Sequence, residues 1–116
     1  MSRISPMREP YQKAGKPVRD ARYLDRVRGL PCCICGGFGM LQNSPTEAHH
    51  CKSGRYGSLR TSDLCAIPLC HSHHNKLRAY PGDEGKIGYH NGQATWEDLY
   101  GPDTDYIAPT QDKLEG

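Results

Sequence analysis

The first stretch of the chain with a regular hydrophobic pattern is "VRDARYLDRVR", residues 18–28. Its apolar residues Ala21, Leu24 and Val27 recur at intervals of three, which places them on one face of a helix. Gly29 follows directly, and glycine commonly ends a helix. The pattern therefore predicts a short amphipathic helix over 18–28 with arginines on its outer face.

The middle of the chain holds two short apolar segments separated by polar residues. We expect "PTEAHH" (45–50) to be the end of a strand and "LCAIPLC" (64–70) to be a second strand, joined by a loop that contains glycine and serine (51–63). The segment "HSHHNKLRAY" (71–80) is expected to be a helix that stops at "PGDEG". Two strands and short helices indicate a small α+β fold.

The two ends of the chain show no such periodicity. Residues 1–17 contain three prolines and are expected to form a flexible basic arm. A helical turn is expected to pack Trp96 and Leu99, and the acidic residues 101–116 are expected to form a poorly ordered tail. One domain, residues 18–100, is predicted between the arm and the tail.

Composition limits what this domain can be. The chain has 116 residues, 35% of them hydrophobic, with 13 glycines, 9 prolines and a mean hydropathy of −0.78, so the core is small and needs a staple. No apolar run approaches the length of a membrane span, and the N-terminus lacks the apolar segment of a signal peptide. We therefore expect a cytoplasmic protein without a membrane partner. In that compartment, six cysteines and six histidines indicate metal sites rather than disulfides.

Charge is distributed unevenly along the chain. Residues 1–30 carry eight Lys and Arg against three Asp and Glu, residues 31–80 carry five against two, and residues 81–116 carry two against eight. The basic first two thirds suit a polyanionic partner such as a nucleic acid. Solvated basic segments show the same pattern, so the charge alone does not identify the partner.

Two pairs of metal-ligand residues share one spacing. Cys32 and Cys35 are separated by two residues in the predicted tight turn "CCICGG", and Cys70 and His73 are separated by two residues at the end of the second predicted strand. Three thiolates and one imidazole form a ligand set typical of a structural, tetrahedral Zn²⁺ site. Since 34 residues lie between the pairs, more than in a simple zinc finger, we expect a further feature to be mounted between them.

Other cysteines offer alternatives to this assignment. Cys33 lies between Cys32 and Cys35 in the sequence, and its side chain should point away from those two thiols. Cys51 and Cys65 have no near partner at ligand spacing. Any of the three could supply a ligand instead, or they could be small core residues. The repeated two-residue spacing favours Cys32, Cys35, Cys70 and His73.

Three further histidines remain for a second site. His49 and His50 end the first predicted strand, where consecutive side chains leave on opposite faces, so we expect them to have different roles. His74 follows the zinc ligand His73 directly and should point elsewhere. One histidine of the strand can bind an ion together with His74, and the other can act as a metal-free base. Adjacent histidines can also be surface residues, or core residues that hydrogen bonds satisfy.

In this order, the motifs resemble those of the HNH endonuclease superfamily, which has a ββα-metal (His-Me finger) fold. The resemblance rests on the Cys32/Cys35 knuckle, "AHH" at a strand end, Asp63 in "TSDL", and "PLC-x-x-HH" opening the helix. The motifs are similar to those of phage Ref-type recombination-associated nucleases, and the resemblance covers roughly residues 30–80. It implies a zinc-stapled ββα-metal fold with extra short helices, acting on DNA. A phage or host recombination protein is a further partner that it implies.

The resemblance also implies roles for individual residues. His49 and His74 match the positions that bind the catalytic metal, His50 matches the general base, and Asp63 matches the central residue that fixes the loop and orients the catalytic strand. Many relatives carry another histidine four residues after the second ligand, where this chain has Arg78. Either the metal keeps two protein ligands, with water and phosphate completing its shell, or Arg78 grips the scissile phosphate. Mg²⁺, Mn²⁺, Ni²⁺ and Zn²⁺ are all candidate ions.

The chemistry is coherent without the family. Imidazole, with an ordinary pKa near ~6.5, suits a base that deprotonates water, and a divalent cation stabilises charge on the leaving oxygen. Basic residues of the predicted ββα unit are candidates for phosphate contacts, although each could equally be solvated. They are Lys52, Arg55, Arg60, Lys76 and Arg78.

Two other functions fit parts of the sequence. A non-catalytic, zinc-stabilised module that binds nucleic acid or a recombination protein would need the zinc ligands but no open metal site. A redox or zinc-storage protein would place thiols at its centre and leave the histidines without a purpose. Convergence of the three histidines on one site therefore separates these alternatives from a nuclease.

Overall fold

The computed structural model describes residues 18–53 and 62–115. The expected flexible arm, residues 1–17, and the candidate phosphate contacts Arg55 and Arg60 lie outside the described residues. Within the described ranges the chain forms a small, compact α+β fold, as predicted.

The first helix, α1, spans Ala21–Arg28, which confirms the amphipathic helix expected from the pattern. It begins later than predicted because Asp20 is its N-cap, and the Asp20 carboxylate accepts a hydrogen bond from the backbone N–H of Tyr23 at 3.0 Å. Val27 is buried on the inner face, while Arg22 and Arg26 are exposed. The helix therefore covers the sheet with one apolar side.

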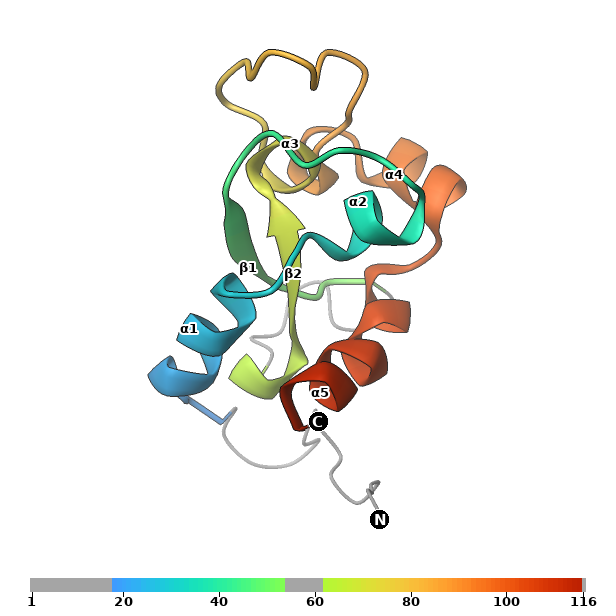
Figure 1. Cartoon of the computed structure of the whole chain (residues 1–116). Helices are drawn as coiled ribbons and strands as arrows, with labels where there is room; N and C mark the ends of the chain where they lie inside the picture. Colours follow the sequence, from blue (N-terminus) through green and yellow to red (C-terminus); the bar gives the residue numbers. More distant parts are fainter. Residues whose placement is uncertain (1–17, 54–61, 116) are drawn as a thin grey trace.

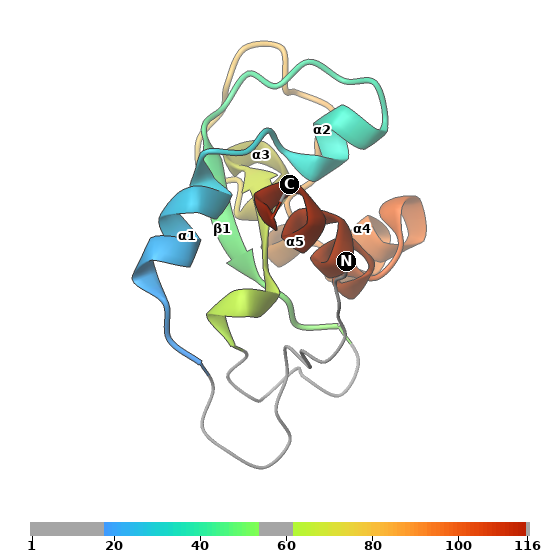
Figure 2. The ribbon, with the colours of Figure 1, turned by 60° about the horizontal axis from the view of Figure 1, so that its bottom comes forward.

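Two antiparallel strands form the centre of the molecule. Strand β1 spans Thr46–His50 and strand β2 spans Ala66–Cys70, so both predicted strands are confirmed. All five residues of β2 are buried, because α1 contacts both strands while α2 (Cys33–Gly37) and α5 (Ile107–Glu115) contact β2. Figure 1 and the turned view in Figure 2 show α1 on one side of the hairpin and α5 on the other.

The helix predicted over 71–80 is wrong in length. Helix α3 covers only His71–His74 and ends at Asn75. The backbone N–H groups that would continue it have other acceptors: Lys76 N–H donates to the Asn91 side chain, and the next two N–H groups donate to Nε2 of His71. Side-chain acceptors have thus replaced the helical carbonyls, and the chain leaves the helix after one turn.

The chain then returns to the core through short helical elements. These are η3 at Tyr89–Asn91 and α4 at Gln93–Tyr100. Trp96 in α4 is fully buried, as predicted, and its indole N–H donates to the backbone oxygen of His73 at 3.1 Å. The expectation that Leu99 also packs inward is wrong, since this residue is 53% exposed.

The acidic tail predicted over 101–116 was expected to be poorly ordered, but its described residues, 101–115, are largely helical. Gly101, with a φ of 88°, turns the chain out of α4, and two helical elements follow: η4 (Asp103–Tyr106) and α5. Buried Ile107 and Thr110 anchor α5. Composition failed here because a few buried side chains, with a buried carboxylate at Asp103, fix a segment whose other charged residues are exposed.

The core mixes aliphatic, aromatic and sulfur-containing side chains. Its fully buried large residues include Ile34, Ile67, Leu69, Tyr89 and Trp96. Buried cysteines belong to the same cluster, which places potential metal ligands inside the core. In the portion of the chain that the structure describes, none of the helices combines the length and apolarity needed to cross a membrane.

Candidate metal centres

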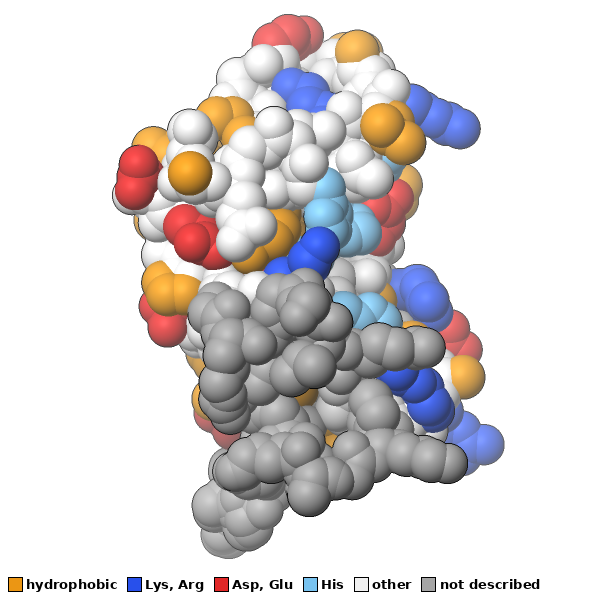
Figure 3. Space-filling model, turned by 180° about the vertical axis from the view of Figure 1, so that it is seen from behind, with side chains coloured by type: hydrophobic (Ala, Val, Ile, Leu, Met, Phe, Trp, Pro, Cys, Tyr) orange, Lys and Arg blue, Asp and Glu red, His pale blue; other side chains and the backbone are white. Residues whose placement is uncertain are grey.

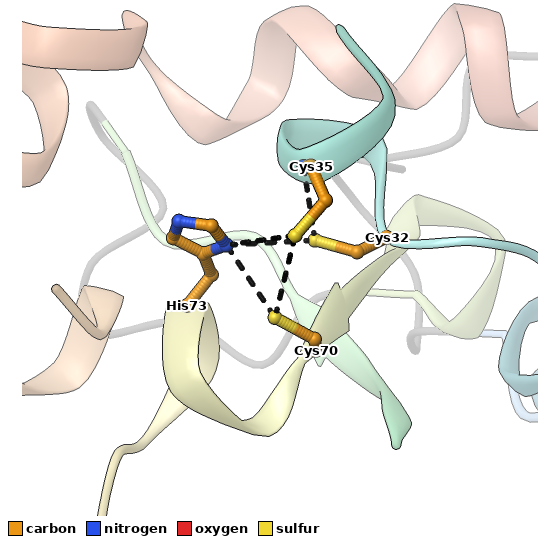
Figure 4. A group of neighbouring side chains, drawn as sticks. All are labelled: Cys32, Cys35, Cys70 and His73. Carbon is orange, nitrogen blue, oxygen red and sulfur yellow. Dashed lines mark hydrogen bonds between the residues drawn. The ribbon is translucent and has the colours of Figure 1, made fainter. Parts of the chain in front are cut away.

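The four residues predicted to bind structural zinc converge in the core (Figure 4). Cys32 is the N-cap of α2, Cys35 lies within that helix, Cys70 ends β2, and His73 lies in α3. Nδ1 of His73 lies 3.7, 3.6 and 3.4 Å from the sulfur atoms of Cys32, Cys35 and Cys70. In a tetrahedral site with Zn–S distances of about 2.3 Å and Zn–N distances of about 2.0–2.1 Å, a nitrogen and a sulfur ligand are about 3.6 Å apart. The spacing of this Cys₃His cluster therefore fits a tetrahedral ion.

Because the four side chains of the Cys₃His cluster are buried, ionisation of their thiols is favoured by a nearby positive charge. All four residues are at most 2% exposed. The pKa of Cys32 is raised, chiefly by its side-chain contact with Cys70 and then by burial, and burial raises the pKa of Cys35. A bound zinc ion would replace the thiol protons and stabilise the thiolates. The cluster can therefore hold a structural metal ion.

Lys86 lies against this cluster, and sequence reasoning missed it. Its ammonium donates to Cys35 Sγ at 3.4 Å and pairs with the buried carboxylate of Asp83 at 2.7 Å. Burial opposes protonation of Lys86, but the contacts with Asp83 and Cys35 outweigh burial and raise its pKa. The ammonium is therefore a fixed positive charge beside Cys35, one of the four residues that could hold an ion.

The remaining cysteines do not join the Cys₃His cluster. Cys33 is half-buried, and Cys51 and Cys65 are buried in the core. Burial raises the pKa of Cys33 and of Cys65 to about 12, so both keep their protons near neutral pH. Cys51 lies close to His49 and Asp103, the one other grouping in which a cysteine of the described residues could bind a metal.

A second cluster unites His49, His74 and His90. Their candidate ligand nitrogens lie within 4.8 Å of one another, and the ring centroids are 5.1, 5.3 and 5.0 Å apart. His49 comes from β1, His74 from α3 and His90 from η3. Two of these histidines were predicted as metal ligands, and the structure brings them together. On the face seen in Figure 3, histidine side chains reach the surface close to basic ones.

Sequence reasoning missed His90. A third histidine was sought four residues after His74, at the position of Arg78, but the chain has left the helix there. The loop after α3 returns through η3 and delivers His90 from sixteen residues away in the sequence. His90 and His71 were the two histidines without an assigned role, which was the only sequence signal for this position.

Carboxylates hold two of the three histidines from behind. Nε2 of His49 lies 2.8 Å from Oδ2 of Asp103, and Nδ1 of His74 lies 2.7 Å from Oε1 of Glu47. The other oxygen of Glu47 contacts Nδ1 of His71 at 3.0 Å. Neither carboxylate was predicted. Glu47 could have been, because it lies two residues before His49 on the same face of β1.

The environment favours the neutral form of two histidines of this cluster, His49 and His90. Burial lowers the pKa of His49, although the hydrogen bond with Asp103 acts in the opposite direction. Burial and the nearby imidazoles of His49 and His74 lower the pKa of His90 to about 4. Neutral imidazole is the form that binds a metal ion. His49 and His90 are therefore in the form that can bind a cation near neutral pH.

His50 points away from the three-histidine cluster, as alternation along β1 predicts. Its side chain is 39% exposed, and its Nε2 lies 2.8 Å from Oδ1 of Asp63. Asp63 also accepts from the backbone N–H of Asp20 at 2.6 Å and from Arg19 at 3.1 Å. Burial opposes ionisation of Asp63, but these hydrogen bonds outweigh it and lower the pKa. Asp63 thus contacts the imidazole of His50 directly, which the resemblance did not imply.

The described candidates for phosphate contacts differ in availability. The side chains of Lys52 and Arg78 are exposed. The ammonium of Lys76 instead donates to three backbone carbonyls, those of Asp83, Glu84 and Lys86. Lys76 therefore braces the loop that carries Lys86, an arrangement at odds with a free phosphate contact.

Comparisons with protein-family models, with curated proteins and with solved structures found no match for this chain. Its function is therefore inferred from the two side-chain clusters and from His50 beside them.

Proposed function

We propose that this protein is a metal-dependent endonuclease of the HNH type, which hydrolyses DNA phosphodiester bonds with His50 as the general base. The observation that carries the proposal is the adjacency of His50 and His49 at the end of β1. One residue offers an exposed imidazole, and its neighbour belongs to the three-histidine cluster. The two side chains leave β1 on opposite faces, so the proposal requires the scissile phosphate to lie across the end of this strand, between the His50 imidazole and an ion held by His49.

The contacts of His50 suit a base. Asp63 already accepts hydrogen bonds from Asp20 and Arg19, so its carboxylate is the acceptor toward His50 and the imidazole carries its proton on Nε2. Nδ1 of His50 then keeps a lone pair. In the proposed reaction, a water oxygen bonds to phosphorus, its proton passes to Nδ1, and the P–O bond to the leaving group breaks. The leaving oxygen takes a proton from solvent.

The three-histidine cluster suits a catalytic cation. A divalent ion held by His49, His74 and His90 would polarise the phosphate and stabilise charge on the leaving oxygen. Three protein ligands leave coordination positions open for substrate, which is typical of catalytic rather than structural sites. Imidazole ligands suit Zn²⁺ and Ni²⁺ better than Mg²⁺, which prefers oxygen.

The Cys₃His cluster supports the same proposal mechanically. Helix α3 has only four residues, yet it carries His73 of one cluster and His74 of the other. A short helix has little stability of its own, so zinc held by His73 would fix the position of His74. The order of β1, β2 and the zinc-stapled α3 is that expected for a ββα-metal unit, which favours the HNH type.

Cleavage of supercoiled plasmid and of single-stranded DNA, with Mg²⁺, Mn²⁺, Ni²⁺, Zn²⁺ or no added metal, tests the proposal. We expect metal-dependent cleavage that His50→Ala reduces at least ~100-fold, the usual contribution of a general base. Added imidazole should restore part of the activity of His50→Ala. Asp98→Ala, a change in α4 outside both clusters, is the control for folding and handling.

More than a few per cent of wild-type cleavage in His50→Ala would overturn His50 as base. Absence of cleavage by the folded, zinc-containing wild type on both DNA forms with all four ions would contradict the nuclease. DNA binding without cleavage would then favour the zinc-stabilised binding module.

A further inference from the structure

Asp103 is the most deeply buried carboxylate near the histidine cluster, and it lies 54 residues from its partner His49. Both side chains are 0% exposed, and their 2.8 Å contact joins Oδ2 to Nε2. A buried carboxylate is strongly unfavourable unless hydrogen bonds satisfy it. Such a residue in a segment of acidic, mostly exposed composition therefore requires an explanation.

The hydrogen bonds of Asp103 determine which nitrogen of His49 carries a proton. Oδ2 accepts from the backbone N–H of Lys52 at 2.8 Å, and Oδ1 accepts from the backbone N–H of Ser53 at 3.1 Å. These two N–H groups can only donate, so the carboxylate is already the acceptor on both oxygens. The contact with His49 therefore places the imidazole proton on Nε2 and leaves Nδ1 with a lone pair.

The other nitrogen of His49 has the features of a metal ligand. Nδ1 is buried and has no hydrogen-bond partner among the described residues. Buried polar atoms are nearly always paired, so an unpaired one indicates a partner such as a cation. His74 and His90 provide the neighbouring nitrogens.

We propose that Asp103 is a positioning residue for a divalent transition metal, holding His49 as the Nε2–H tautomer so that Nδ1 binds the ion beside His74 and His90. The inference rests on the histidine metal site of the proposed nuclease. A carboxylate behind a ligand histidine fixes the ring and makes its free nitrogen more basic, and its loss typically lowers metal affinity 10–100-fold.

The C-terminal segment acquires a function through this contact. Asp103 opens η4, and α5 anchors that element through buried Ile107 and through a 2.8 Å hydrogen bond from Gln111 to the backbone oxygen of Leu64. Leu64 lies in the short helical element η2 (Asp63–Cys65), directly before β2. The end of the chain is thereby tied to the sheet, and it holds one metal ligand from behind.

Titration of the zinc-loaded, full-length protein with Ni²⁺ in a calorimeter tests the inference. We expect Asp103→Asn to weaken Ni²⁺ binding 10–100-fold. An amide has one acceptor oxygen, so it cannot accept from His49, Lys52 and Ser53 as the carboxylate does. One zinc ion per chain should remain in the Cys₃His cluster, measured by elemental analysis.

Two further variants separate positioning from general loosening. Asp105→Asn removes an exposed carboxylate from the same element and should leave Ni²⁺ affinity unchanged. Ser53→Ala keeps the Asp103 side chain but removes the hydroxyl that accepts from the backbone N–H of Asp103 at 3.1 Å and donates to Glu97 at 2.6 Å. If Ser53→Ala weakens Ni²⁺ binding as much as Asp103→Asn, Asp103 acts only by holding the turn, and the inference is overturned.

A readout independent of metal affinity is the tautomer of His49. Long-range ¹H–¹⁵N NMR of the zinc-loaded protein without Ni²⁺ should show the Nε2–H form in the wild type and its partial loss in Asp103→Asn. A wild-type Nδ1–H form would overturn the inference even if Asp103→Asn does not fold. Wild-type protein that binds no Ni²⁺ would instead contradict the proposed nuclease site, whereas unchanged Ni²⁺ binding in folded Asp103→Asn would contradict only the role of Asp103.

Discussion

The two histidine-containing clusters share one helical turn and yet differ in almost every physical respect. His73 lies in a closed core site with three cysteines, whereas His74 faces a second cluster that has the exposed residue His90 on its rim. Successive residues of a helix point about 100° apart, so a single turn can serve two sites. The adjacent histidines in "HSHH" therefore belong to two separate side-chain clusters, each with a spacing that could hold a metal ion.

The groups that surround each cluster differ in charge as well. Three thiolates and Zn²⁺ together carry one negative charge, and the Cys₃His cluster has the ammonium of Lys86 beside it. Three neutral imidazoles with a divalent ion carry two positive charges, and the histidine cluster has the carboxylates of Asp103 and Glu47 behind it. Each site thus meets charge of the opposite sign from the protein, which favours a metal in both positions.

Cys35→Ser should produce the largest effect in this comparison. Structural zinc contributes about 10–16 kcal/mol of binding free energy, comparable to or larger than the whole stability of a small domain, about 5–15 kcal/mol. We therefore expect Cys35→Ser to lose zinc and its cooperative thermal transition, monitored by circular dichroism and elemental analysis. Cys33→Ser, a half-buried neighbour in the same helix, should keep both. An unchanged melting temperature and one bound zinc in Cys35→Ser would move the structural site elsewhere.

His90→Ala should have the next largest effect, confined to the three-histidine cluster of His49, His74 and His90, called the open site below because His90 is exposed. Removal of one of three ligands should weaken Ni²⁺ binding by at least ~100-fold while the structural zinc and the melting temperature stay near wild type. Arg78→Ala is the matched control, because many relatives in the resemblance carry a histidine at that position, whereas the structure groups His90 with His49 and His74. Equal Ni²⁺ affinity in wild type and His90→Ala would show that two histidines suffice.

The same contrast explains how much the sequence could predict. The Cys₃His cluster consists of two local pairs, so the spacing of its residues in the sequence identified it. The pairs are Cys32 with Cys35 and Cys70 with His73. The open cluster depends on a loop whose course is fixed by contacts such as Asn91 with the backbone N–H of Lys76, and no local pattern encodes them. His90 was missed for that reason.

The helices and strands show the same difference between features set by local sequence and features set by distant contacts. The helix around Val27 and both strands were predicted because their apolar residues repeat at regular intervals. The C-terminal elements η4 and α5 were not predicted, because they depend on contacts that Asp103 and Ile107 make with residues far away in the sequence. Composition describes the exposed side of such a segment and not its few buried anchors.

Removal of the Lys86 ammonium, which lies beside the Cys₃His cluster, should have a smaller effect than either of these two changes. Lys86→Met should speed zinc release to a chromogenic chelator by about tenfold, because Cys35 loses the ammonium that lies 3.4 Å from its sulfur. The variant also strands the buried Asp83, so Lys86→Met with Asp83→Asn is needed to remove that secondary penalty. Lys76→Met, which removes an ammonium from backbone carbonyls of the same loop, is the control. Equal release rates in the double variant and in Lys76→Met would show that Lys86 acts only by bracing the loop.

The smallest expected effect concerns the surface of the open site and depends on the proposed nuclease. Lys52 is exposed directly after β1, so Lys52→Ala should weaken DNA binding a few-fold and lower the slope of log affinity against log salt by about one. Lys76→Ala should leave that slope unchanged, because its ammonium already donates to three carbonyls. Fluorescence anisotropy with a labelled duplex at several salt concentrations measures both slopes. A loss of slope in Lys76→Ala equal to that in Lys52→Ala would mean that Lys76 leaves its carbonyl partners when DNA binds. The loop that carries Lys86, beside the Cys₃His cluster, would then lose this brace on DNA binding.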